Sequence, residues 1–99
     1  MKVKNKLSNF VIILNEKDNV ATTLKDIDKG SSIEVLAENK KDGIIIEVKE
    51  NIDPGFKLSL AHIKKGEKVY KYGDTIGIAR LDIKPGEKVH IKNMSSLIK

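Results

Sequence analysis

A small set of polar side chains in this sequence could act on a small molecule. They are histidines, cations and one amide: His62, His90, Lys57, Lys71, Arg80 and Asn93. A histidine can serve near neutral pH as a general base, a metal ligand or a hydrogen-bonding group. Ammonium and guanidinium groups bind carboxylates well when they are partly buried. These residue types point to an anionic substrate, although a single lysine carries little weight in a chain this rich in lysine.

Each histidine also has a structural alternative. His62 occupies a position in a repeated turn pattern that Asp26 and Asp82 fill elsewhere, so we expect it to cap a turn. His90 lies near the end of a predicted strand, close to Asn93. A base, a metal ligand, a substrate contact and an exposed histidine without a role are all chemically reasonable there.

The motifs that would define a reaction are absent. The sequence has no P-loop, no dinucleotide-binding glycine fingerprint, no nucleophile elbow and no paired-histidine metal helix. It has no cysteine, which excludes disulfides, thiolate zinc ligands and cysteine nucleophiles from this sequence. A metal would need histidine, carboxylate, amide or backbone ligands.

Length and composition predict one globular domain over residues 1–99, with 39% hydrophobic and 33% charged residues. The longest apolar run, from Phe10 to Leu14, is too short to span a bilayer, and no signal-peptide pattern is present. We therefore expect a cytoplasmic protein with no membrane association. The net charge of +5 comes mostly from scattered lysines. Because nucleic-acid binders usually combine a basic stripe with arginines and aromatic platforms, no nucleic-acid partner is expected.

Short runs of β-branched residues predict a mostly β fold. The expected strands cover residues 11–14, 33–36, 44–48, 68–72, 75–81 and 88–92. In the last of these, Val89 and Ile91 would face one side and His90 the other. One short helix is predicted over residues 19–27, where apolar residues recur at helical spacing, and a second short turn over residues 58–63.

Glycine and proline stand where chain reversals are expected. Asp42 and Gly43 suit a hairpin, while Pro54-Gly55 and Pro85-Gly86 suit type II turns with glycine at positive φ. A pattern of a polar residue, Ile, two residues, Gly, two residues and Ile or Val occurs at 26–33, 62–69 and 82–89. We expect its Ile to enter the core, its Gly to form the turn and its last residue to begin a strand.

Longer stretches of the chain resemble the SAF domain of the altronate and galactarate dehydratases. The resemblance runs over residues 53–79 and 82–93, and upstream it includes Asp18-Asn19-Val20-Ala21-Thr22. Its most specific residues are types that turns alone do not require: Lys71-Tyr72-Gly73, Ile76-Gly77, Val89-His90 and Asn93.

This resemblance implies a SAF-type β-clip with one or two short helices, acting with a much larger catalytic part that is fused or separate. It implies elimination of water from a sugar acid such as altronate or galactarate, with Fe²⁺ or Mn²⁺ shared with the large subunit. A related pair of subunits releases sulfite from sulfolactate. By the same resemblance, Lys71 and His90 act in catalysis and His90 also ligates the metal. The residues that would contact the substrate are Lys57, Tyr72, Gly73 and Asn93.

Two positions depart from the family pattern. Phe56 and Lys92 stand where the family usually has histidine, which removes two potential metal ligands or proton carriers. The leading hypothesis is a small subunit or stand-alone N-terminal domain of a sugar-acid dehydratase that is inactive without its large subunit. The alternative is a non-catalytic module that binds a carbohydrate or a protein. A third hypothesis is self-association through exposed strands.

Overall fold

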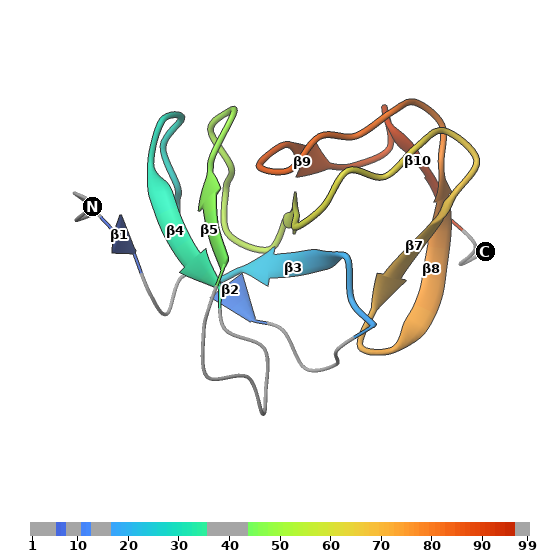
Figure 1. Ribbon diagram of the computed structural model, residues 1–99, viewed down its shortest axis with the longest axis horizontal. Coiled ribbons are helices and arrows are strands. Elements are labelled where there is room, and N and C mark those ends of the chain that lie inside the picture. The colour runs from blue at the N-terminus through green and yellow to red at the C-terminus, as the bar shows by residue number, and fades with distance from the viewer. Residues whose placement is uncertain (1–5, 8–10, 13–16, 36–43, 97–99) are drawn as a thin grey trace.

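The structure is a computed structural model that describes residues 6–7, 11–12, 17–35 and 44–96. These residues form short strands joined by turns, with no helix among them (Figure 1). The strands are β1 (Lys6–Leu7), β2 (Val11–Ile12), β3 (Val20–Thr23), β4 (Ser32–Val35), β5 (Ile44–Glu47), β6 (Lys57–Ser59), β7 (Lys68–Lys71), β8 (Asp74–Ala79), β9 (Lys88–Val89) and β10 (Met94–Ser96). The predicted mostly β fold is confirmed.

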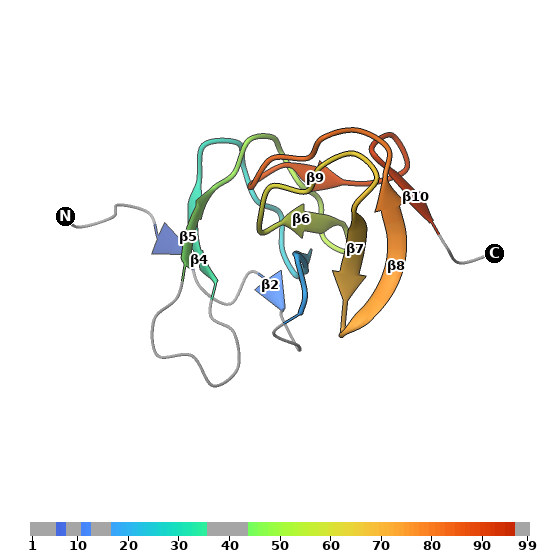
Figure 2. The same ribbon diagram turned by 45° about the vertical axis from the view of Figure 1, so that its right-hand side comes forward.

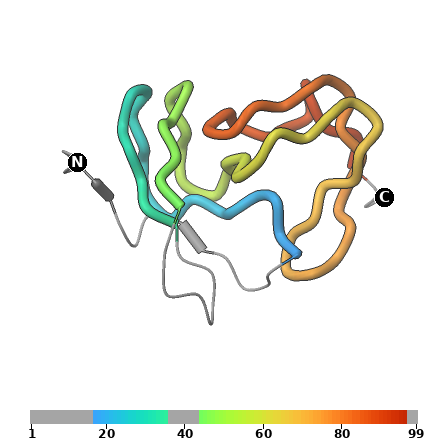
Figure 3. Tube along the Cα trace, in the orientation of Figure 1, coloured from blue at the N-terminus to red at the C-terminus, as the bar shows by residue number. Residues whose placement is uncertain are grey.

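The described strands form small sheets with the orders β1-β4-β5, β2-β3-β6-β9 and β10-β8-β7. All neighbouring strands are antiparallel except β1 and β4. The views in Figures 1 and 2 place the β4–β5 hairpin and the β7–β8 hairpin at opposite ends of the molecule. In Figure 3 the chain runs from the β7–β8 end through β3 to the β4–β5 end and then returns through the middle to the β7–β8 end. Within the described part of the chain, no helix is long and apolar enough to cross a membrane.

The helix predicted over residues 19–27 is wrong. Residues 20–23 form β3, which pairs with β2 on one side and with β6 on the other. Val20, Ala21 and Thr23 are all buried, because β3 lies inside the molecule, and only Thr22 is partly exposed. A strand covered on both faces loses the alternating pattern, and its apolar residues can then imitate helical spacing. Residues 58–63 likewise hold the end of β6 and an isolated bridge at Ile63.

Most predicted strands are confirmed with small changes at their ends. Residues 33–36, 44–48, 68–72 and 75–81 correspond to β4, β5, β7 and β8, shifted by one or two residues. The strand predicted over 88–92 ends at Val89, because the N–H groups of Asn93 and Met94 both donate to the carbonyl of His90 in a turn. Ile91 is therefore 78% exposed instead of sharing a face with Val89. β2 covers residues 11–12; residues 13–14 and the turn predicted at Asp42-Gly43 lie outside the described residues.

The repeated turn pattern occurs in four copies. The fourth, at residues 51–58, ends in Leu58 instead of Ile or Val, so the sequence pattern did not include it. The isoleucine of every copy is buried, and every turn glycine has a φ of 89–90°. These isoleucines are Ile27, Ile52, Ile63 and Ile83. The predicted core and turn roles are confirmed, including positive φ at Gly55 and Gly86.

The copies pair two by two through the same reciprocal hydrogen bonds. Ile27 and Ile52 exchange both backbone N–H···O bonds at 2.9 Å, and Ile63 and Ile83 do so at 2.8 Å. Each turn glycine donates its N–H to the residue that stands four positions before the partner's isoleucine. These bonds are Gly30 to Val48, Gly55 to Thr23, Gly66 to Ala79 and Gly86 to Ser59, at 2.8–2.9 Å. Each pair is therefore locally two-fold symmetric, and the second pair repeats the first.

Each pair of copies surrounds its own hydrophobic cluster. The first cluster contains Ile27, Ile33, Val35, Ile46, Val48, Ile52 and Leu58. The second contains Val20, Ile63, Val69, Ala79, Ile83, Val89 and Met94. The sheet that holds β3, β6 and β9 lies between them, since Leu58 belongs to the first cluster whereas Val20 and Val89 belong to the second. Residues of this sheet that share a face with Val20 and Val89 are directed towards the β7–β8 side.

Candidate functional site

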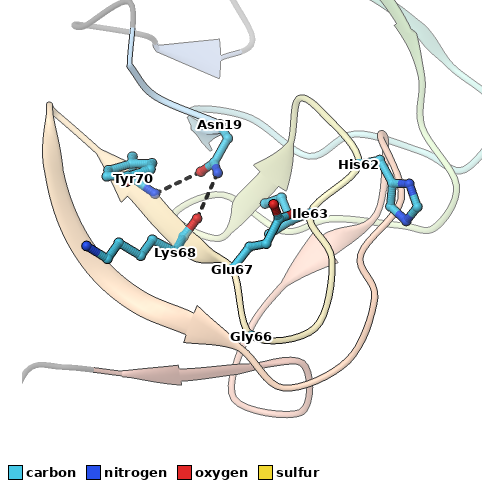
Figure 4. Close-up of a pocket in the computed structure, with 7 residues that line it drawn as sticks. All are labelled: Asn19, His62, Ile63, Gly66, Glu67, Lys68 and Tyr70. Atoms are coloured by element: carbon cyan, nitrogen blue, oxygen red, sulfur yellow. Dashed lines mark hydrogen bonds between the residues drawn. The ribbon is translucent and has the colours of Figure 1, made fainter.

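Asp18 and Asn19 hold the β7–β8 hairpin through side-chain hydrogen bonds. Asn19 pairs with β7 much as a neighbouring strand would: its Nδ2 donates to the carbonyl of Lys68 at 3.0 Å and its Oδ1 accepts from the N–H of Tyr70 at 2.8 Å (Figure 4). Asp18 Oδ1 accepts from the N–H of Gly73 at 2.8 Å. The two segments lie about 50 residues apart in the sequence, so these contacts are a tertiary feature.

The tip of this hairpin has an unusual backbone. Tyr72 and Gly73 have φ values of 56° and 81°, and Lys71 pairs with Asp74 below them. Positive φ at both central residues is the type I′ turn, for which Asn-Gly is the favoured sequence. A tyrosine there costs about 1–2 kcal/mol. Because its side chain is also 47% exposed, Tyr72 has the strain and access expected of a functional position.

Lys57 is directed towards the same hairpin from the central sheet. It lies in β6, opposite Thr22 of β3 and Val89 of β9, and is half-buried. The pKa of Lys57 lies below its ordinary value, mainly because burial disfavours the charged ammonium and secondly because Lys71 is also positive. The phenol of Tyr72 acts in the opposite direction. Lys57, Lys71 and Tyr72 are therefore close enough to interact electrostatically, and the structure brings these three predicted site residues together.

A hydroxyl without a hydrogen-bond partner lies on the same sheet face. The Oγ1 atom of Thr22 is buried and has no partner among the described residues. Thr22 is directly opposite Lys57, a relationship that places two Cβ atoms about 4.5–5.5 Å apart. Lys57 has no ion pair within the described structure, and Lys71 contacts the ring of Tyr72, with Nζ 4.9 Å from the centroid. We call Thr22, Lys57, Lys71 and Tyr72 the cationic face.

His90 and Asn93 lie in the turn that follows β9, one and four residues after Val89, the partner of Lys57. Asn93 builds this turn: its Oδ1 accepts from the N–H of His90 and its Nδ2 donates to the carbonyl of Lys88, both at 2.8 Å. The ring of His90 is half-buried and makes no hydrogen bond within the described structure. Strand pairing thus brings the backbone of His90 close to Lys57, and Asn93 fixes that backbone.

The capping role predicted for His62 is wrong. In the equivalent positions, Asn51 Oδ1 accepts from the N–H of Lys29 and Asp82 Oδ1 accepts from the N–H of Lys65, both at 2.8 Å. The local two-fold places Pro85 opposite His62, and proline has no N–H to donate. His62 is exposed and lines two shallow pockets, one with Pro85 and one with Asn19, Glu67, Lys68 and Tyr70 (Figure 4).

The described residues do not form a metal site by themselves. No group of three or more His, Cys, Asp or Glu side chains among them could hold an ion. Phe56, which stands where the resemblance expects histidine, instead lies under Lys88, whose Nζ is 4.3 Å from the ring centroid. His90 could supply at most one ligand to a metal that the remaining ligands hold elsewhere.

The family of this chain follows from its sequence. The profile of the altronate/galactarate dehydratase SAF domain matches residues 9–97. The chain belongs to this family. A relative named altronate dehydratase from Bacillus subtilis (strain 168) is 39% identical over 82 residues, and another from Escherichia coli (strain K12) is 35% identical over 82 residues. Each match covers 83% of this chain but only 15% of the relative, so the chain spans a small part of the length of these proteins.

Family membership confirms the resemblance read from the sequence. Reasoning from the sequence missed Thr22 and the positioning roles of Asp18 and Asn19. The resemblance includes both Asp18-Asn19 and Lys71-Tyr72-Gly73, but nothing in the sequence shows that these two segments meet. Nothing in the sequence distinguishes the hydroxyl of Thr22 from that of Thr23, which bonds the carbonyls of Asp53 and Phe56.

Proposed function

We propose that this chain is the SAF part of a sugar-acid dehydratase and acts with a larger catalytic part, either as a small subunit or as a fused domain. The family and the named relatives support this proposal. The match to only 15% of each relative supports the need for a larger part, because most of the length of those enzymes has no counterpart here.

The cationic face is the observation that carries the proposal. Elimination of water next to a carboxylate needs a base for the α-proton, positive charge to stabilise the developing enediolate and an acid for the leaving hydroxyl. Lys57 and Lys71 can bind the substrate carboxylate and stabilise that charge. His90 follows Val89, the strand partner of Lys57, and can serve as a proton carrier. Tyr72 and Gly73 shape the hairpin tip, and Asn93 positions His90.

Fe²⁺ or Mn²⁺ belongs, in this proposal, to the site shared with the larger part. No group of three or more His, Asp or Glu side chains among the described residues could hold an ion, so these residues do not make a metal site of their own. No step of the reaction is therefore assigned to a metal held by this domain.

Co-expression with a large dehydratase chain from the same genome tests the proposal. The purified complex is assayed for dehydration of C3 to C6 hydroxy acids with added Fe²⁺ or Mn²⁺. We expect turnover that requires both chains and falls at least about 100-fold in His90→Ala, the range of general acid–base contributions. A complex whose turnover is unchanged in His90→Ala, or failure of the chains to associate, would contradict the proposal.

A second candidate is a non-catalytic module that binds a carbohydrate or protein partner. Phe56 favours it, because this residue cannot carry a proton and stands where the resemblance expects histidine. Its side chain is 40% exposed and contacts Lys88 Nζ. Binding of neutral glycans by the isolated chain, together with an inert complex, would favour this candidate over the first.

A further inference from the structure

The cationic face has features of a binding site that is complete within this domain. Two ammonium groups on half-buried lysines lie near one another and have no carboxylate partner within the described structure. Like charges at such positions repel, and burial removes water that would otherwise screen them. An anion placed between them would relieve both effects.

The hydroxyl of Thr22 adds an independent observation. Buried hydroxyls usually have a hydrogen-bond partner, and one without a partner needs an explanation. The register of β3 and β6 places Thr22 directly opposite Lys57 on the same sheet face. Thr22 as a whole is partly exposed although its hydroxyl is buried, and no hydrogen bond holds that hydroxyl in place. Rotation about χ1 can therefore turn it towards a ligand oxygen at Lys57.

We propose that Thr22, Lys57 and Lys71 form a subsite that binds an α-hydroxy carboxylate in this domain without any partner chain. The two ammonium groups bind the carboxylate, and Thr22 Oγ1 bonds the ligand oxygen next to it. Tyr72 holds Lys71 by contact of its ring with Nζ, so the strained turn fixes the second cation. The choice of an α-hydroxy acid over other anions rests on the proposed function. The binding of an anion as such rests only on the two charges and the unpartnered hydroxyl.

The chain supplies a matched control. Lys88 is also half-buried in the central sheet, but it lies opposite Leu58, on the other face. Its Nζ contacts the ring of Phe56 and does not belong to the cationic face. Lys88→Met therefore removes the same charge from the same sheet without touching the proposed subsite.

Titration of the full chain by ¹H–¹⁵N NMR tests the subsite. The probes are D-gluconate, acetate, sulfate and the neutral polyol D-glucitol. We expect gluconate to shift the amide signals of Thr22, Lys57 and residues 71–73 and to bind at least about fivefold more tightly than acetate. Lys57→Met and Lys71→Met should each weaken gluconate binding about tenfold or more, while Lys88→Met leaves it unchanged.

Thr22→Val separates binding from folding. Because it replaces an unpartnered buried hydroxyl with a methyl group of similar shape, the variant should melt no lower than the parent. It should nevertheless lose the preference for gluconate over acetate. Equal affinity for gluconate and sulfate, or a gluconate affinity unchanged in Lys57→Met, would overturn the subsite.

The two proposals fail separately. If the complex with a large chain dehydrates a sugar acid while its KM is unchanged in Lys57→Met and Lys71→Met, the subsite is overturned and the proposed function stands. If the isolated chain binds gluconate as described but no partner gives turnover, the subsite stands and the proposed function is overturned.

Discussion

Asp18 Oδ1 accepts a hydrogen bond of 2.8 Å from the backbone N–H of Gly73, 55 residues later in the chain. With the bonds of Asn19 to β7, this contact joins two short segments of the family pattern in space. One segment forms the hairpin tip, and the other holds it in place. The position of Lys71 relative to Lys57 therefore depends on residues that are themselves outside the cationic face.

Replacement of Asn19 should destabilise the hairpin. Asn19→Ala leaves the carbonyl of Lys68 and the N–H of Tyr70 without partners, so we expect a loss of about 1–3 kcal/mol in the free energy of unfolding. Asn19→Asp keeps the acceptor for Tyr70 and should lose less. Urea titration followed by far-UV circular dichroism measures the free energy of unfolding of both variants. Equal stability of Asn19→Ala and the parent would contradict the role of this side chain.

Tyr72 should show opposite effects on stability and function. Tyr72→Asn places a favoured residue in the type I′ turn, and we expect the domain to gain about 0.5–1 kcal/mol. The variant also loses the ring that contacts Lys71, so turnover of the reconstituted complex should fall. Thermal melting and the dehydration assay measure the two effects. Tyr72→Phe is the control: it keeps the ring that contacts Lys71, so Lys71 should keep its position.

Two turn glycines with nearly the same φ should differ in their tolerance of alanine. At Gly66 an added methyl group meets no atom within 4 Å, so Gly66→Ala pays only the backbone cost of about 1–2 kcal/mol. At Gly86 the methyl group would overlap the carbonyl oxygen of Glu47, where the two pairs of copies meet. The backbone cost and this steric overlap together should lower the free energy of unfolding of Gly86→Ala by roughly 2–5 kcal/mol. Similar melting temperatures for the two variants would contradict this packing.

His62 and Asp82 occupy equivalent positions but should differ in their contribution to stability. Asp82→Ala removes the acceptor of the Lys65 N–H and should cost about 1 kcal/mol. His62→Ala should change the free energy of unfolding by less than about 0.5 kcal/mol, because Pro85 offers no N–H. Chemical denaturation of the two variants measures the difference in their free energies of unfolding. A larger loss in His62→Ala than in Asp82→Ala would be inconsistent with the local two-fold.

The lowered pKa of Lys57 predicts a pH dependence of stability. The unfolded chain binds more protons than the folded chain between the lowered pKa and the ordinary value of 10.5, so this residue's contribution to stability rises with pH through that window. Lys57→Met should therefore be more stable than the parent at pH 7, and this advantage should shrink towards pH 10.

Lys57→Arg is the control for this pH dependence, since an arginine stays charged throughout the scan. The difference in melting temperature between Lys57→Arg and Lys57→Met should remain nearly constant from pH 7 to pH 10. A constant difference between the parent and Lys57→Met over the same range would contradict the predicted direction.

The sequence by itself determined the turns, the mostly β character and the family. Positive φ at a glycine and burial of the preceding isoleucine are decided by single residues, so the repeated pattern predicted them correctly in the copies it detected. The family could be read because residues such as Lys71-Tyr72-Gly73 and His90 are not required by turns.

Only the tertiary structure decided which residues meet. Burial of β3 on both faces made a strand look like a helix, and a proline in a partner copy removed the N–H that His62 would have capped. Likewise, the electrostatic interaction of Lys57 with Lys71 and Tyr72 depends on the register of β6 and on the hydrogen bonds of Asp18 and Asn19. Pairing between distant strands follows from how the whole core packs, and no local pattern in the chain encodes it.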